Sequence, residues 1–162
     1  GQINRAAHFC GGRMQTRVAN LGTTYSVSIR FWNGMPIDSR PVLGWMFGRG
    51  QNYSAKATGD SLGLNAKGQL IFGNGQETLT GKASAERWKW HHALLVREGE
   101  NVQVYLDGKL EISGKAKVPA PVETFFIGGN NSKQSSWEGR LDETAIFNRA
   151  LSATEVKALS TP

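Results

Sequence analysis

The chain has 162 residues, with 19 Lys and Arg against 13 Asp and Glu and a formal net charge of +6. This length is enough to bury a core without covalent staples, and the single cysteine excludes an internal disulfide. The longest apolar runs are too short to cross a bilayer, which argues against membrane insertion. Abundant glycine, together with short aromatic and β-branched runs between turn residues, indicates an all-β sandwich or barrel.

The clearest strand pattern of the first half lies at residues 24–32. Apolar side chains occupy the odd positions from 25 to 31. The even positions hold Ser26, Ser28, Arg30 and Trp32, so the two sets point to opposite faces. Further strands are predicted at 6–10, 14–19, 41–48, 60–66 and 68–73. Cys10 is flanked by apolar residues and glycine, and we predict a small buried residue there.

Residues 87–114 contain two adjacent histidines, two tryptophans and an aspartate, which are the ingredients of an active site. Their pattern instead predicts three strands, at 88–97, 102–107 and 109–113. A tight turn at Asp107–Gly108 joins the last two, because glycine tolerates the positive φ that such turns need. This stretch is therefore predicted to be the middle of a sheet.

The two histidines of this stretch point to opposite faces of the first strand, so they cannot bind one metal ion together. His92 shares its face with Leu94 and Val96. We therefore predict a core histidine with a hydrogen-bond partner, and we place Trp90 in the core beside it. Trp88, at the start of the strand, fits either a buried or an exposed position.

The chain ends in two further strands, at 124–129 and 140–147, and a short helix. Ser152 and Glu155 form a capping box, and Leu151 and Val156 form the matching hydrophobic staple. The helix is predicted to run to about residue 159 and to pack beside the sandwich. No repeat or linker interrupts the chain, so we predict one domain over residues 1–162.

The second half of the sequence resembles the laminin G-like, concanavalin A-like jelly-roll domains over roughly residues 87–160. The residues that carry the resemblance are Trp90 and His92, then Tyr105, Asp107 and Gly108, then Ile127, Gly128 and Gly129, then Gly139, Leu141, Asp142 and Glu143, and finally Ala150, Leu151, Ser152 and Glu155. Two positions depart from the family pattern: Cys10 stands where an aspartate is frequent, and Arg30 where a tryptophan is frequent.

The resemblance implies a two-sheet antiparallel jelly-roll sandwich with one short C-terminal helix. It also implies a module that is usually non-catalytic and binds carbohydrate or glycoprotein. Such modules are often appended to larger secreted bacterial enzymes or surface proteins, so an extracellular or cell-surface location is expected. Members of the family sometimes carry a structural calcium ion, for which Asp142 is the best candidate ligand. No other cofactor is expected.

A glycoside hydrolase would need two carboxylates at a defined separation. Glu138 and Asp142 share a strand face but lie about 13 Å apart at the rise of a strand, which exceeds both mechanistic separations. Glu143 is predicted to point to the other face, and the Glu-x-Asp-x-x-Glu pattern of the related glucanases is absent. The chain is therefore predicted not to be an enzyme.

Sugar binding requires an aromatic ring for stacking and polar side chains for the hydroxyls, and an acidic sugar also favours Arg or Lys. Three surfaces offer this mixture. The predicted binding residues are Arg49, Asn52, Tyr53 and Lys56 in the first loop, Asn130, Asn131, Lys133 and Trp137 in the second, and Arg30 and Trp32 on a strand face. Tyr53 or Trp137 is the expected platform, and Arg49 or Lys56 the expected partner of an anion.

The charge distribution suggests the kind of ligand. Residues 1–76 contain eight Lys and Arg but two Asp, whereas the remaining residues contain eleven of each sign. This asymmetry favours an anionic partner, so we predict a carbohydrate-binding module for a sulfated or uronic-acid polysaccharide. A protein-interaction or adhesion module is the main alternative, and a hydrolase or lyase on the same fold is a weaker one. Nucleic acid ranks last, because no recognised binding motif accompanies the charge.

Overall fold

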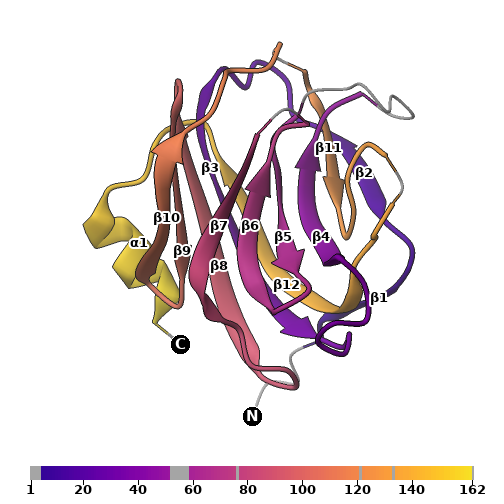
Figure 1. Cartoon of the computed structure of the whole chain (residues 1–162). Coiled ribbons are helices and arrows are strands. Elements are labelled where there is room, and N and C mark those ends of the chain that lie inside the picture. The colour runs from indigo at the N-terminus through magenta and orange to yellow at the C-terminus, as the bar shows by residue number, and fades with distance from the viewer. Residues whose placement is uncertain (1–4, 52–58, 76, 121, 133, 162) are drawn as a thin grey trace.

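The computed structural model describes residues 5–51, 59–75, 77–120, 122–132 and 134–161. These residues form two antiparallel sheets that face each other, with one helix on the outside (Figure 1). Sheet A contains, in spatial order, β1 (Ala7–Cys10), β12 (Glu138–Phe147), β3 (Thr24–Asn33), β8 (Trp90–Glu98), β9 (Asn101–Leu106) and β10 (Lys109–Lys115). Sheet B contains β2 (Met14–Arg17), β11 (Thr124–Ile127), β4 (Val42–Arg49), β5 (Ser61–Asn65), β6 (Gln69–Gly73) and β7 (Thr78–Ser84). The predicted fold class is confirmed.

The core lies between the sheets, and the period-two pattern of β3 points into it. Tyr25, Val27, Ile29 and Phe31 are all fully buried, as the alternation predicts. They meet aromatic and aliphatic side chains from β4, β5, β6 and β11 of sheet B. The opposite face of β3, which starts with two serines and ends with Arg30 and Trp32, is the outer face of sheet A.

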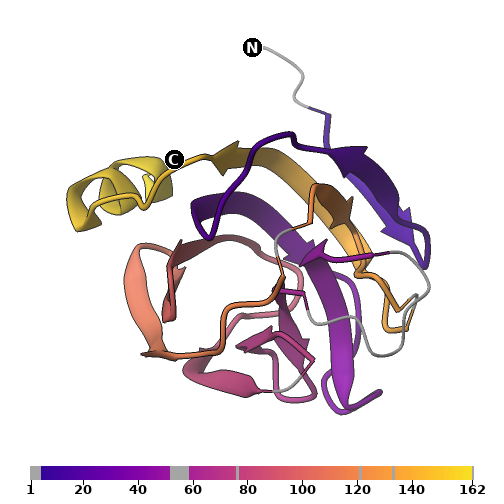
Figure 2. The same cartoon turned by 90° about the horizontal axis from the view of Figure 1, so that it is seen from above.

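The helix α1 (Ala153–Ser160) covers part of this outer face. Its N-terminus has the predicted capping box between Ser152 and Glu155. Leu151 and Val156 pack against Leu94, Val96 and Tyr105 of β8 and β9, so a second, smaller hydrophobic cluster forms outside sheet A. Figure 2 shows α1 at one end of the sheet, away from β1. Strand β8 therefore buries apolar side chains on both of its faces.

His92 lies in this second layer rather than between the sheets. It is 2% exposed. Its Nε2 is 2.7 Å from the Ser28 hydroxyl, and its Nδ1 is 3.1 Å from the Ser160 hydroxyl of α1. The prediction of a buried, hydrogen-bonded histidine is confirmed, but Trp90 on the same face is 44% exposed, so its prediction as a core residue was wrong. The helix covers Leu94 and Val96 and stops short of Trp90.

The burial of His92 makes the stability of the fold depend on pH. Burial, followed by the Arg30 charge, lowers the pKa of His92 from 6.5 to about 4. Between these two values the unfolded chain binds more protons, so the free energy of unfolding is expected to fall as the pH drops through this window. The loss is expected to reach at most about 3 kcal/mol. Urea unfolding at pH 7.5 and 4.5 measures it, and His92→Gln should show a smaller loss than the native chain. Equal losses in both proteins would contradict this account.

Strand β7 was not predicted. It is an edge strand with few apolar residues, and five of its seven residues are exposed, so no alternation marks it in the sequence. Its free side lies against β10, the edge strand of sheet A. There the Glu111 carboxylate accepts hydrogen bonds of 2.9 and 2.8 Å from the backbone N–H groups of Lys82 and Ala83. Because these contacts come from a residue 28 or 29 positions away, local sequence does not reveal the strand.

A group of buried polar side chains closes the end of the sandwich where β3 begins and β8 ends. The Tyr25 hydroxyl donates a 2.6 Å hydrogen bond to Asp60 Oδ2, which also lies 3.3 Å from Arg97 Nε. Arg97 donates to the carbonyls of Ala116 and Lys117 at 3.0 and 2.8 Å. Asp60 and Arg97 are both 1% exposed, so this is a fully buried ion pair.

Candidate functional site

Arg49 and Trp137, the predicted anion partner and the predicted platform, both lie inside the protein. Arg49 is 4% exposed, and its guanidinium donates to the carbonyls of Val122 and Gly22 at 2.9 and 2.7 Å. Trp137 is fully buried in the core, where its ring meets Phe31 edge-on at 5.7 Å. The expectation that Arg49 pairs an anion and Trp137 stacks on a sugar is therefore corrected, because neither side chain presents a surface to a ligand.

The other residues of the two predicted loops offer little to build on. Asn130 and Asn131 are both buried. The Asn130 side chain accepts hydrogen bonds from the N–H and the hydroxyl of Ser132, at 3.1 and 2.8 Å, and so shapes its own turn. Asn52, Tyr53, Lys56 and Lys133 lie outside the described residues, and their role stays a prediction.

The third predicted surface, the face with Arg30 and Trp32, is accessible. Both side chains are partly exposed on the outer face of sheet A. The register places Trp32 opposite Trp90 of β8 on one side and opposite Arg140 of β12 on the other. Tryptophan and arginine thus meet from three neighbouring strands, beyond the end of the area that α1 covers.

On this surface two neighbouring tryptophan rings lie between two guanidinium groups. The Trp32 and Trp88 rings are 4.8 Å apart, with 61° between their planes. Arg87 lies 4.0 Å from the centre of the Trp88 ring, and Arg140 lies 5.3 Å from that of Trp32. Trp88 is 56% exposed and has a φ of 69°, which is unusual for a bulky residue. A strained, exposed tryptophan of this kind is typical of a functional site.

Two hollows indent this face, and Arg140 lines both of them. The first has a volume of about 260 Å³ and is called the His8 hollow; it is lined by His8, Phe9, Cys10, Trp32, Gly34, Trp88, Glu138, Gly139 and Arg140. The second has a volume of about 290 Å³ and is called the Trp90 hollow; it is lined by Ala6, Arg30, Trp90, Arg140, Asp142 and Glu143. Both hollows lie along β12 and share Arg140, and we call the two together the Arg140 groove. Cys10 is exposed at its edge, so its prediction as a buried residue was wrong.

The carboxylates of the groove differ in whether they are paired. Glu143 lies 2.6 Å from Arg30 Nε, and Glu138 lies 3.2 Å from a guanidinium nitrogen of Arg40. Asp142 Oδ1 accepts a hydrogen bond of 2.9 Å from the N–H of Glu143. Among the described residues, neither Asp142 nor Arg140 forms an ion pair. The groove therefore presents one unpaired cation and one unpaired anion.

The strand pattern predicted that Glu143 points to the face opposite that of Asp142, and this prediction was wrong. The pairing of β12 with β3 shifts between Asp142 and Ala145, and Glu143 has a φ of 46° at this bulge. A bulge adds a residue to one strand and turns its side chain. Asp142 and Glu143 therefore line the same hollow.

The surroundings of Asp142 do not fit a calcium ion. Calcium takes six to eight oxygen ligands, usually several of them carboxylates. No cluster of three or more metal-binding side chains occurs in the described part of the chain. The cross-strand neighbour of Asp142 is Arg30, and the adjacent Glu143 carboxylate already pairs with that arginine. We therefore assign no metal to Asp142, and a structural calcium ion elsewhere stays a prediction.

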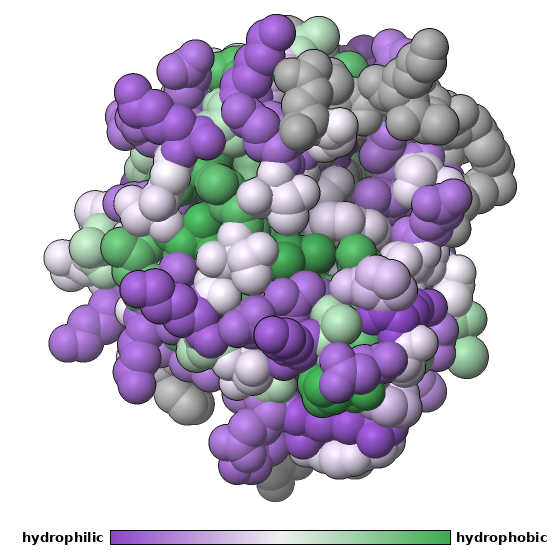
Figure 3. All heavy atoms as spheres, in the orientation of Figure 1, coloured by the Kyte–Doolittle hydropathy of each residue, from purple (hydrophilic) through white to green (hydrophobic). Residues whose placement is uncertain are grey.

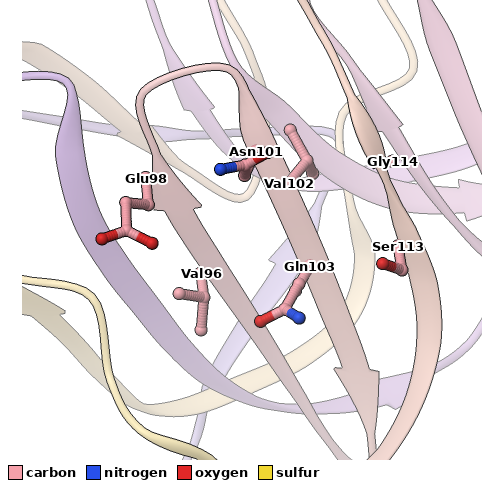
Figure 4. Close-up of a pocket in the computed structure, with 7 residues that line it drawn as sticks. All are labelled: Val96, Glu98, Asn101, Val102, Gln103, Ser113 and Gly114. Carbon is pink, nitrogen blue, oxygen red and sulfur yellow. The ribbon is translucent and has the colours of Figure 1, made fainter.

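Two other surfaces differ from the groove in their side chains. A hollow of about 200 Å³ on β8, β9 and β10 is lined by Val96, Glu98, Asn101, Val102, Gln103, Ser113 and Gly114, and it contains no aromatic ring for stacking (Figure 4). The outer face of sheet B has hydrophobic surface across its middle (Figure 3). There the partly buried Trp45 packs over Gly63 and Gly73. The Arg140 groove is the surface where aromatic and cationic side chains converge.

Four residues of the groove escaped prediction: His8, Trp88, Trp90 and Arg140. The signal that could have found them is the polar outer face of β3, because its cross-strand neighbours must share that face. The register that makes Trp90 and Arg140 the neighbours of Trp32 joins positions far apart in the chain.

No helix among the described residues has the length and apolar character needed to span a membrane. No curated protein matches the sequence. Many solved structures share the fold, among them the following three. Domain 4 of AbnA, a GH43 extracellular arabinanase from Geobacillus stearothermophilus, in complex with arabinotriose, is 21% identical with a TM-score of 0.73, over 99% of this chain and 79% of that one. The Ruminococcus gnavus IT-sialidase CBM40 is 13% identical with a TM-score of 0.69, over 86% and 83%.

The third structure, a sialidase from Trypanosoma rangeli, is 18% identical with a TM-score of 0.72, over 99% of this chain but 28% of that one. These identities are low enough that the likeness concerns the fold. A family model for the Concanavalin A-like lectin/glucanases superfamily matches residues 11–157. The chain belongs to this superfamily.

Proposed function

We propose that this chain is a non-catalytic carbohydrate-binding module that holds an anionic polysaccharide in the Arg140 groove. The observation that carries the proposal is the juxtaposition of the open Trp90 ring with the unpaired Arg140 guanidinium. A tryptophan face can cover the apolar face of a sugar ring, and a guanidinium can bind a carboxylate or sulfate with two hydrogen bonds.

The fold comparisons support a carbohydrate as the ligand. The arabinanase domain was solved with arabinotriose, and the Ruminococcus gnavus CBM40 with α2,3-sialyllactose, which are both carbohydrates. By analogy with such domains, we propose that the module belongs to a larger secreted or surface-attached protein and acts outside the cell. The other domains of that protein would supply any catalysis.

A non-catalytic role is supported by the state of the carboxylates. Glu138 and Glu143 are each engaged by an arginine, so neither is held ready to donate or accept a proton at a sugar. Incubation of the chain with polysaccharide is expected to release no new reducing or unsaturated ends. Release of such ends would favour the hydrolase or lyase alternative.

Trp90→Ala is expected to weaken binding of the retained polysaccharide by about 1–3 kcal/mol, which is about five- to 150-fold in Kd, because a central stacking ring is lost. Affinity electrophoresis identifies the polysaccharide, and calorimetric titration measures the change. Leu110→Ala is a matched control, since Leu110 is a similarly exposed apolar residue on a hairpin outside the groove. The Leu110→Ala variant should bind the polysaccharide with the same affinity as the native chain.

Equal affinity for folded Trp90→Ala and the native chain would place the sugar elsewhere. Absence of retention by any polysaccharide, combined with capture of a protein partner, would favour an adhesion module. That alternative rests on the same exposed tryptophans, Trp88 and Trp90.

A further inference from the structure

The two hollows of the Arg140 groove differ in charge, although they adjoin. In the His8 hollow, Arg40 neutralises Glu138 from outside, so Arg140 dominates. In the Trp90 hollow, Arg30 and Glu143 neutralise each other, and the remaining charges are those of Arg140 and Asp142. The His8 hollow therefore favours an anion, and once an anion there occupies Arg140, Asp142 is left uncompensated in the Trp90 hollow and disfavours a second anion.

The Trp90 hollow has the chemistry for a neutral sugar. The Trp90 ring makes no ring or cation contact with any described residue, so both the ring and the Asp142 carboxylate are available to a ligand. A carboxylate accepts hydrogen bonds from hydroxyl groups but repels another carboxylate or a sulfate. With Arg140 occupied by an acidic unit, a second acidic unit in this hollow would be repelled by Asp142, whereas a neutral sugar could donate a hydroxyl to it.

The spacing fits two or three successive units of one chain. Both hollows are lined by β12, along which the backbone advances about 13 Å from Glu138 to Asp142. Arg140 lies midway, so an acidic unit beside the Trp32 and Trp88 rings can reach it while the next unit lies over Trp90. The ligand would pass through the groove as an internal stretch of a chain.

From these charges, we propose that the groove selects a polysaccharide in which acidic and neutral units lie next to each other, and discriminates against chains that carry a charge on every unit. Arg140 recognises the acidic unit, and Asp142 excludes a second charge from the Trp90 hollow. This inference rests on the proposed function, because it specifies the class of glycan that the same groove would bind.

The test uses chains that share one backbone and differ in charge. Polygalacturonate carries a free carboxylate on every unit. Its half-methylated ester carries one on about every second unit, and its fully methylated ester carries none. Hyaluronan is the fourth polymer, a chain in which different sugars alternate. We expect affinity electrophoresis to show the strongest retention on the half ester and on hyaluronan. Arg140→Gln should retain the half ester and the full ester equally.

Asp142→Asn distinguishes selection from general attraction to anions. Removing the negative charge should strengthen binding to polygalacturonate about three- to tenfold, since one like-charge repulsion disappears at short range. It should not strengthen binding to the fully methylated ester. Glu98→Gln and Lys115→Gln remove the same charges outside the groove, at exposed positions, and should change neither affinity.

Two kinds of failure can be told apart. In the first kind, retention rises steadily with the number of charges on the polymer, and Asp142→Asn does not change this trend. That result would overturn the selection for mixed chains but would leave anionic glycan binding in place. Absence of retention by all four polymers would contradict the proposed function itself, and the inference with it.

Discussion

Asp60→Asn is expected to lower the free energy of unfolding by about 3–5 kcal/mol at neutral pH, because it removes the anion of a buried ion pair. Arg97 is 1% exposed and cannot regain water without opening the end of the sandwich. Asparagine can still accept a hydrogen bond from the Tyr25 hydroxyl, but it cannot form an ion pair with the buried Arg97 guanidinium. Urea unfolding measures the loss.

The pH dependence of this loss gives a second test. Burial raises the pKa of Asp60, although the charge of Arg97 and the hydrogen bond from Tyr25 act in the opposite direction. The folded chain therefore takes up a proton here before the unfolded chain does, and its stability increases relative to the unfolded state as the pH falls. Asp60→Asn lacks this titration, so its loss of stability relative to the native chain should widen toward acid pH.

Controls separate this effect from substitution as such. Asp38→Asn changes an exposed loop residue in a left-handed conformation that asparagine also tolerates, and should alter stability by less than about 0.5 kcal/mol. The double variant Asp60→Leu with Arg97→Met is expected to be more stable than Asp60→Asn, since it does not leave Arg97 buried without its partner. An Asp60→Asn variant as stable as Asp38→Asn would show that the pair contributes nothing.

Trp137→Ala is expected to destabilise the fold by about 3–5 kcal/mol and to leave glycan affinity per folded molecule unchanged. The ring is fully buried, and a Cβ added at Gly44 would lie 2.8 Å from it, which shows how closely the backbone encloses it. Its removal leaves a cavity that these packed neighbours cannot collapse to fill.

Thermal unfolding and calorimetric titration of Trp137→Ala and Trp90→Ala together give a crossed comparison. The first variant should lose stability but retain affinity, and the second should show the reverse. Trp137→Phe should cost less than Trp137→Ala, because it keeps most of the ring and removes an Nε1–H group that has no hydrogen-bond partner. A large loss of affinity in folded Trp137→Ala would show that this residue contributes to the binding site.

Prediction from sequence succeeded where one face of a strand is polar and the other apolar. The alternation in β3 correctly separated the core side chains from Arg30 and Trp32. In β8 it could not assign Trp90, because α1 makes the outer face apolar for half of the strand and leaves it open for the rest. The capping box predicted where α1 begins, since that signal is local.

The binding residues were harder to predict than the fold because composition does not reveal burial. Arg49 has the same chemistry as Arg140, but one is enclosed by backbone carbonyls and the other lies on the surface. The bulge that turns Glu143 outward depends on the pairing of β12 with β3, which joins segments more than a hundred residues apart. Both differences arise from tertiary contacts.

The contact between the edge strands β7 and β10 also affects whether the chain aggregates at high local concentration. An open strand edge can template the addition of a strand from another chain, which is a common route to aggregation. Here the two edge strands face each other, and Glu111 occupies the N–H groups of Lys82 and Ala83 that an incoming strand would use. Many copies could therefore lie close together on an insoluble polymer without joining through this edge into fibrils.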